Sequence, residues 1–124
     1  MMRLLSNRFC YDIETCSVPL MDVYETRGYL VYEIDLPGID PADVTIHVLG
    51  DLLIIEGYRG DDETTACSAR YLCMERSRRH FRRVVRFPIL VDAAAGQATY
   101  DQGVVTIRFP KLKDRMIRIP IEGG

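Results

Sequence analysis

The fold is decided by residues 29 to 57, YLVYEIDLPGIDPADVTIHVLGDLLIIEG. Its first part, residues 29–36, alternates between two sets of side chains, as a half-buried β-strand does. Pro37-Gly38 ends this run with a strong turn signal. Asp40-Pro41-Ala42-Asp43 then predicts one helical turn, with Asp40 as N-cap and the proline at the first helical position.

The second part of the stretch predicts a β-hairpin. Residues 44–48 alternate with a period of two, so three apolar side chains share one face: Val44, Ile46 and Val48. Gly50-Asp51 is a tight-turn signal, and residues 52–57 are predicted to return as the second strand. We expect Ile54 and Ile55 of this strand to occupy core positions.

The rest of the chain repeats this pattern of short runs separated by turn residues. Further short runs bounded by turn signals cover residues 18–26, 70–74, 81–89, 98–100 and 104–109, and no long amphipathic helix is evident. About eight strands with turn signals every roughly 8–12 residues are typical of a sandwich. We therefore predict an all-β, immunoglobulin-like antiparallel β-sandwich.

Length and composition indicate a single domain with two short appendages. The 124 residues are 48% hydrophobic and carry a formal net charge of −2. We assign residues 1–17 to a short N-terminal arm, 18–110 to the sandwich and 111–124 to a C-terminal extension. The sequence has no apolar run of about 18 residues and no apolar signal-peptide core, so we expect a cytoplasmic protein without a membrane partner.

Candidate catalytic and metal-binding residues are few. The two histidines, His47 and His80, have no acid partner evident in the sequence, and no P-loop is present. The cysteines form two C-x5-C pairs, a spacing that matches neither a zinc site nor a thioredoxin-like motif: Cys10, Cys16, Cys67 and Cys73. We expect free thiols, no metal, no cofactor and no enzyme, while a metal site or regulatory disulfide stays the alternative for the cysteines.

The strongest charge anomaly is residues 76–86, with six arginines in eleven positions. A basic patch can bind nucleic acid, but Phe81 is its only aromatic residue and the whole chain is slightly acidic. Arginine also suits ion pairs across an interface, and charges on an edge strand prevent uncontrolled sheet growth. We therefore expect interface or solvated charge rather than nucleic acid, with acidic complements at residues 61–63 and 75.

The C-terminal extension ends in Ile119-Pro120-Ile121, two β-branched apolar residues on either side of a proline. Proline favours an extended backbone in the residue before it, so both isoleucines are predicted to point the same way. Such a tail cannot bury its own side chains and needs a groove on its own domain or on another copy.

Taken together, these segments resemble the small heat shock proteins, which are built on an α-crystallin domain. The resemblance covers residues 18–121 and includes YEIDLPGIDPADVTIHV, VLGDLLIIEG, MERSRRHFRRVVRFP and GVVTI. The Ile119-Pro120-Ile121 tail is similar to the family's I-x-I motif. Arg79 stands where the family pattern usually has glycine.

The resemblance implies an ATP-independent chaperone, a holdase, that captures partly unfolded client proteins and prevents their aggregation. It implies a homodimer made by strand exchange, with higher oligomers beyond it, and an interface at Arg70, Tyr71, Leu72, Cys73, Met74 and Arg83. The tail isoleucines would sit in a groove of another dimer, lined by Val44, Ile46, Val48, Ala98 and Tyr100. The alternative is a cochaperone or adaptor of related topology, such as a CS domain, which generally lacks the exchanged strand and the tail motif.

Overall fold

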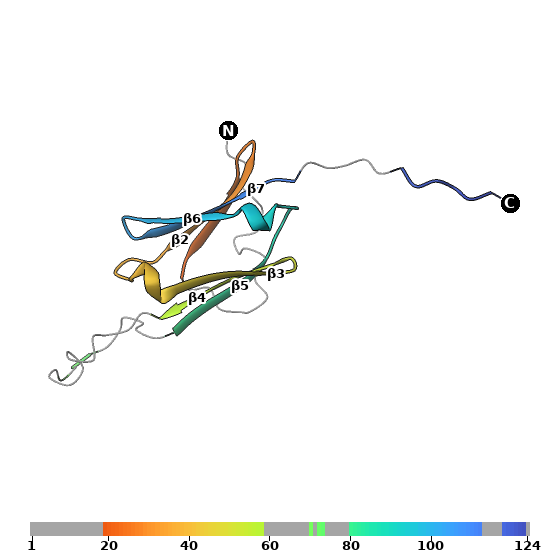
Figure 1. Cartoon of the computed structure of the whole chain (residues 1–124). Coiled ribbons are helices and arrows are strands. Elements are labelled where there is room, and N and C mark those ends of the chain that lie inside the picture. Colours follow the sequence, from red (N-terminus) through yellow and green to blue (C-terminus); the bar gives the residue numbers. More distant parts are fainter. Residues whose placement is uncertain (1–18, 59–69, 71, 74–79, 113–117, 124) are drawn as a thin grey trace.

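The computed structural model describes residues 19–58, 70, 72–73, 80–112 and 118–123. The described strands form two antiparallel sheets, which Figure 1 shows stacked face to face. The four-stranded sheet has the order β1-β2-β7-β6 and the three-stranded sheet the order β3-β4-β5. Their bounds are β1 Met21–Glu25, β2 Tyr29–Asp35, β3 Val44–Leu49, β4 Leu52–Tyr58, β5 His80–Arg86, β6 Gln97–Asp101 and β7 Val104–Pro110. The predicted antiparallel β-sandwich is confirmed.

The core lies between the two sheets and follows from the alternation in the strands. In β2, Leu30, Tyr32 and Ile34 face inward and are almost completely buried. The centre is aromatic, because Tyr32, Phe87 and Phe109 pack edge to face with ring centroids 5.1–6.2 Å apart. Such T-shaped pairs add to the stabilisation that comes from area burial alone.

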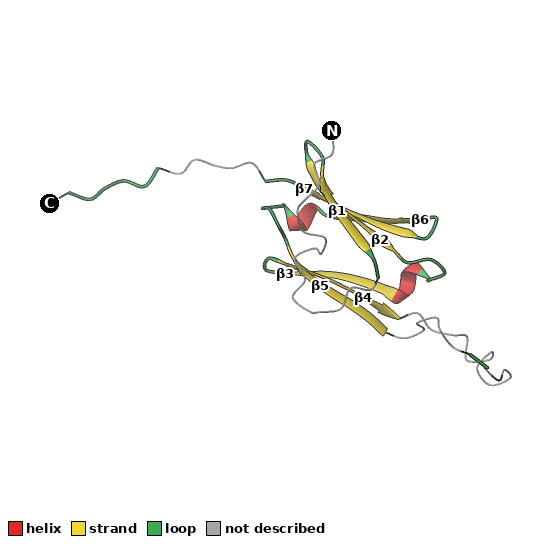
Figure 2. Cartoon of the chain, turned by 180° about the vertical axis from the view of Figure 1, so that it is seen from behind, coloured by secondary structure: helices red, strands yellow, loops and turns green. Residues whose placement is uncertain are grey.

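Two short 3-10 helices lie in connections between strands of different sheets and are drawn red in Figure 2. The 3-10 turn η1, Pro41–Asp43, confirms the prediction, since Asp40 Oδ1 accepts a hydrogen bond of 3.0 Å from the Ala42 N–H. A second 3-10 turn, η2, covers Ala93–Ala95. The β6–β7 turn has positive φ at both Gln102 (49°) and Gly103 (80°), the type I′ geometry that suits a two-residue hairpin.

One expectation about the strands was wrong in detail. Ile55 is fully buried, but Ile54 points to the outer face of the three-stranded sheet, because neighbouring residues of a strand face opposite sides. The strand expected over residues 70–74, which is to pair with another copy, stays a prediction, since Arg70, Leu72 and Cys73 belong to no strand in the single chain. Seven strands are therefore present in the described part, rather than about eight.

The sandwich has two open borders, each made by one edge strand from each sheet. Strands β1 and β6 are the edges of one sheet, and β3 and β5 are the edges of the other. The buried Arg83 of β5 donates a 2.8 Å hydrogen bond from Nη1 to the carbonyl of Pro19, just before β1. This bond places β1 and β5 at one border, so β3 and β6 form the other.

Candidate functional site

The predicted tail-binding residues gather at the border formed by β3 and β6. Three of them lie on the inward face of β3 and become more exposed toward its end: Val44, Ile46 and Val48. Ala98 and Tyr100 lie on the facing side of β6, opposite the buried Ile107 and Val105 of β7. Figures 1 and 2 both show β6 above β3. Val44, Ile46 and Tyr100 are partly buried there, whereas Val48 and Ala98 are exposed, so apolar side chains from both sheets line the border where the tail-binding groove is predicted.

Tyr100 stabilises one wall of this groove. Its hydroxyl donates a 2.9 Å hydrogen bond to the carbonyl of Leu36, at the end of β2. A phenol held at its tip keeps its ring in one orientation, so the apolar face of the ring is available without an ordering cost.

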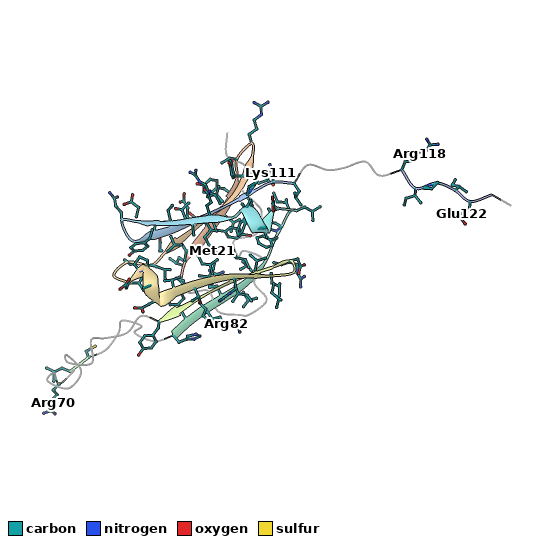
Figure 3. All side chains as sticks on the ribbon, in the orientation of Figure 1. Met21, Arg70, Arg82, Lys111, Arg118 and Glu122 are labelled. Atoms are coloured by element: carbon teal, nitrogen blue, oxygen red, sulfur yellow. The ribbon has the colours of Figure 1, made fainter. Side chains whose placement is uncertain are left out.

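The tail motif lies far from any groove of its own chain. Residues 118–123 have no regular secondary structure, and Figure 3 shows Arg118 and Glu122 well clear of the sandwich. Ile119 is 82% exposed and Ile121 is 96% exposed, while Pro120 between them is exposed as well. Both isoleucine side chains are therefore open to solvent in the single chain.

The predicted dimer-interface residues divide into two groups. Leu72 is 92% exposed, Arg70 and Cys73 are exposed, and Figure 3 places Arg70 well away from both sheets. Arg83 instead lies inside the single chain, where it is 4% exposed and donates to the carbonyl of Pro19. Tyr71 and Met74 lie outside the described residues.

A charged cluster that the sequence does not reveal lies on the outer face of β4 and β5. Glu56 Oε2 is 3.1 Å from His80 Nε2 and 3.7 Å from Arg82 Nε. At the other end of β5, Arg86 pairs with Asp51. Strand pairing brings these residues together over 24 to 35 positions, which a single sequence cannot show. The acids expected to complement the arginine run, residues 61–63 and 75, lie outside the described residues.

A cavity of about 330 Å³ opens between the β3–β4 turn and the segment that crosses from β5 to β6. Apolar residues line most of it: Phe87, Pro88, Ile89, Leu90, Val91 and Ala93, with Gly50 and Asp51 at the turn. It contains no titratable group other than the Asp51 carboxyl, which pairs with Arg86. Its lining offers space for apolar groups and no catalytic constellation.

The pKa of Tyr24, on the outer face of the four-stranded sheet, is raised. The Tyr24 hydroxyl donates a 2.7 Å hydrogen bond to Glu33 Oε1. This bond, burial and the nearby carboxylate charge all raise the pKa of Tyr24, because each favours the neutral phenol.

The remaining chemistry-bearing side chains are dispersed. His47 is exposed on the outer side of β3, as its alternation predicted. Within the described ranges, no three His, Cys, Asp or Glu side chains lie close enough to hold a metal ion together. Cys73 is an exposed free thiol, whereas Cys10, Cys16 and Cys67 lie outside the described residues. No helix in the described part is long and apolar enough to cross a membrane.

Comparison with known proteins shows the family to which this sandwich belongs. The profile of the Hsp20/alpha crystallin family matches residues 22–122, which include every described strand but the first residue of β1. The chain belongs to this family. The resemblance noted in the sequence is therefore confirmed.

Relatives in plants and bacteria share the same domain. A 19.0 kDa class II heat shock protein of Oryza sativa subsp. japonica is 35% identical over 117 residues, which cover 84% of this chain and 67% of the rice protein. Spore protein SP21 of Stigmatella aurantiaca is 34% identical over 76% of this chain and 55% of its own length. This member of the Hsp20/alpha crystallin family thus spans between about half and two thirds of the length of these relatives.

Solved structures support the same assignment. A small heat-shock protein from Xylella fastidiosa matches with a TM-score of 0.69 and 32% identity over 86% of this chain and 97% of its own. The hspA protein from Xanthomonas axonopodis matches with a TM-score of 0.65 and 33% identity over 75% of this chain and 92% of its own. The Xylella protein is described as having a distinct high order structure.

Proposed function

We propose that this small heat shock protein is an ATP-independent holdase, which binds partly unfolded proteins in the cytoplasm and prevents their aggregation. The observation that carries the proposal is the pair of isoleucines at 119 and 121, which stand exposed on a chain whose β3–β6 border is lined by apolar side chains. Both features are sites for extended, apolar peptide. Partly unfolded proteins expose many extended apolar segments, so they are the class of partner that these features would bind.

The tail and the groove are complementary in geometry. Ile119 and Ile121 are two positions apart, so in an extended tail they project to the same side. The β3 residues Val44, Ile46 and Val48 have the same spacing on the groove side. A strand added at this edge would satisfy backbone groups while its alternate side chains fill the groove.

The opposite border supports self-association through strand exchange. Strand β1 pairs only with β2 among the described strands, so its outer edge presents backbone groups that an arriving strand could pair with. The exposed Leu72 lies in the segment between β4 and β5, which is long enough to reach a second copy. We propose that this segment pairs with β1 of the partner, and that tails then link dimers into larger assemblies.

These contacts are individually weak, and that weakness is functional. Two buried isoleucines contribute about 3–6 kcal/mol before the tail is ordered, so one tail binds loosely and several bind well through effective concentration. Warming weakens the net binding because the ordering entropy grows in importance, and this frees grooves and tails for clients.

The decisive experiment measures light scattering from a heat-denatured client with and without this protein, in the absence of nucleotide. We expect suppression at equal mass, together with a native mass larger than a monomer. A strict monomer that leaves client aggregation unchanged would overturn the proposal. If instead removal of residues 119–124 changes neither mass nor client protection, the adaptor alternative is favoured.

A further inference from the structure

The outer face of the three-stranded sheet carries an apolar strip that the sandwich itself does not use. Strand pairing aligns Leu49 with Leu52, and Ile54 with Val84, and all four side chains point away from the core. The strip crosses the sheet diagonally from the β3 edge to the β5 edge. An outer face in contact with solvent normally shows polar residues at these positions.

Burial shows that part of this strip is covered. Val84 points outward from an edge strand, where it has a neighbouring strand on one side only, yet it is 5% exposed. The arginines two positions away along the strand, Arg82 and Arg86, are about half exposed and pair with acids on β4 and on the β3–β4 turn. They are directed along the sheet toward these acids.

An outward-facing valine is buried in the other sheet too, but its own neighbours account for that burial. Val31 also points outward and is 1% exposed, but it lies in the central strand β2. It is directly opposite Tyr24 of β1 and Arg108 of β7, two large side chains that account for its burial. Val84 has no comparable pair of neighbours, because β5 has no strand on its far side in the described chain.

The sequence of the two strands agrees with a covered face. Residues 52–55 (LLII) and 84–85 (VV) are apolar at consecutive positions, so both sides of each strand are apolar there. Strands with apolar residues on both faces are typical of sheets that are packed on both sides.

We propose that the apolar strip is the docking site of the N-terminal arm, residues 1–17, of the same chain. The arm joins the body at Pro19, whose carbonyl is bonded to Arg83, the residue next to Val84 on the same edge strand. The arm therefore begins at the border of this face. It contains apolar residues suited to the strip: Leu4, Leu5, Phe9, Tyr11 and Ile13.

The length of the arm and the small area of the apolar strip favour the arm as occupant over a second copy of the sandwich. An extended segment of this length reaches about 55–60 Å, whereas the three strands of this sheet span roughly 10 Å between outer strand axes. Four aliphatic side chains offer only a small fraction of the roughly 800 Å² per partner that a stable dimer interface buries. The strip is large enough for a peptide and too small for a sheet-to-sheet dimer.

The first test uses the arm's own cysteines as reporters in the full chain. Cys10 and Cys16 are alkylated in the native protein and in the double variant Ile54→Thr with Val84→Thr, and each site is followed by mass spectrometry. Threonine keeps the β-branched shape and removes apolar area, so the strands are retained. We expect the alkylation rates of both cysteines to rise about tenfold, the equivalent of about 1.4 kcal/mol.

The matched control is Val31→Thr, the same change at the outward, buried valine of the other sheet, and it is expected to leave both rates unchanged. Unchanged rates in a folded double variant overturn the proposal, and so does an equal rise in the control. Neither readout involves a client, so failure of this inference is distinguishable from failure of the chaperone proposal.

A second measurement keeps the test independent of variant stability. Leu52→Cys places a thiol in the strip of an otherwise native chain, which is then oxidised as a mixture of isotopically light and heavy protein. A disulfide from position 52 to Cys10 or Cys16 within one chain supports the proposal. Bonds that only join light to heavy chains, or that only involve Cys67 or Cys73, overturn it.

Discussion

Replacing both tail isoleucines, Ile119→Ala with Ile121→Ala, should separate assembly from folding. Each side chain is exposed in the single chain, at 82% and 96%, so almost all of its burial occurs on docking. Each change removes three carbons, worth about 0.8 kcal/mol each when fully buried, or about 5 kcal/mol for the pair. Because the groove is only half-buried, we expect a loss of about 3 kcal/mol, which weakens each tail contact by more than about 100-fold.

Native mass spectrometry and size-exclusion chromatography measure this loss. We expect assemblies larger than a dimer to disappear, while the free energy of unfolding stays within about 0.5 kcal/mol of the unmodified protein. Leu112→Ala is the control, because it also removes exposed apolar surface from the C-terminal segment but lies outside the motif. A variant that unfolds, or one that keeps its native mass, would show that the isoleucines do not dock on another copy.

Three further predictions concern the sandwich itself. Gly57→Ala should destabilise by about 1–3 kcal/mol in urea unfolding, because its Cβ would lie 2.5 Å from the Phe81 ring and 2.8 Å from the Asp43 carbonyl oxygen; Gly28→Ala, with open space around it, should be neutral or slightly stabilising. Ile55→Ala should cost about 2–5 kcal/mol and Ile54→Ala clearly less, and equal losses would contradict their opposite orientations. Folding raises the pKa of Tyr24, so its neutral hydroxyl stabilises the fold fully below the unfolded pKa of 10.0, and this stabilisation is lost as pH rises through the folded pKa. Tyr24→Phe should therefore reduce the loss of stability at alkaline pH, measured by urea unfolding.

The strands could be predicted because their local patterns agree with the final fold. Residues 44–48 alternate strictly and end at Gly50-Asp51, so period and turn chemistry both indicate a hairpin, and the structure has one. The N-cap role of Asp40 was equally readable, since capping involves neighbours within two or three residues. Interactions between residues a few positions apart can be predicted because the residues that make them are neighbours in the sequence.

Other features depend on pairing over long distances and could not be read in the same way. Residues 52–55 are all apolar, so their sequence does not show which alternate pair faces the core, and it could not show that Ile54 faces outward. The bond between Arg83 and the Pro19 carbonyl joins residues 64 positions apart and depends on both sheets being in place. A strand over residues 70–74 is predicted to pair with β1 of another copy, and the sequence of one chain does not record a pairing between copies.

The tail-binding residues could be predicted from the sequence only in part. Alternation predicted that Val44, Ile46 and Val48 share one face, whereas Ala98 and Tyr100 were implied by the family resemblance. The structure places both strands at one border. That an Ile-Pro-Ile tail fills this border came from the family resemblance alone, and it stays a prediction.

In the proposed assembly each copy takes part in three contacts, because its β1–β5 side binds a partner, its β3–β6 side receives a tail and its own tail binds another copy. A link made on one side leaves the other vacant, so the number of linked copies has no geometric stop within a single subunit. Closure of such an assembly would then depend on the angle at which successive copies meet.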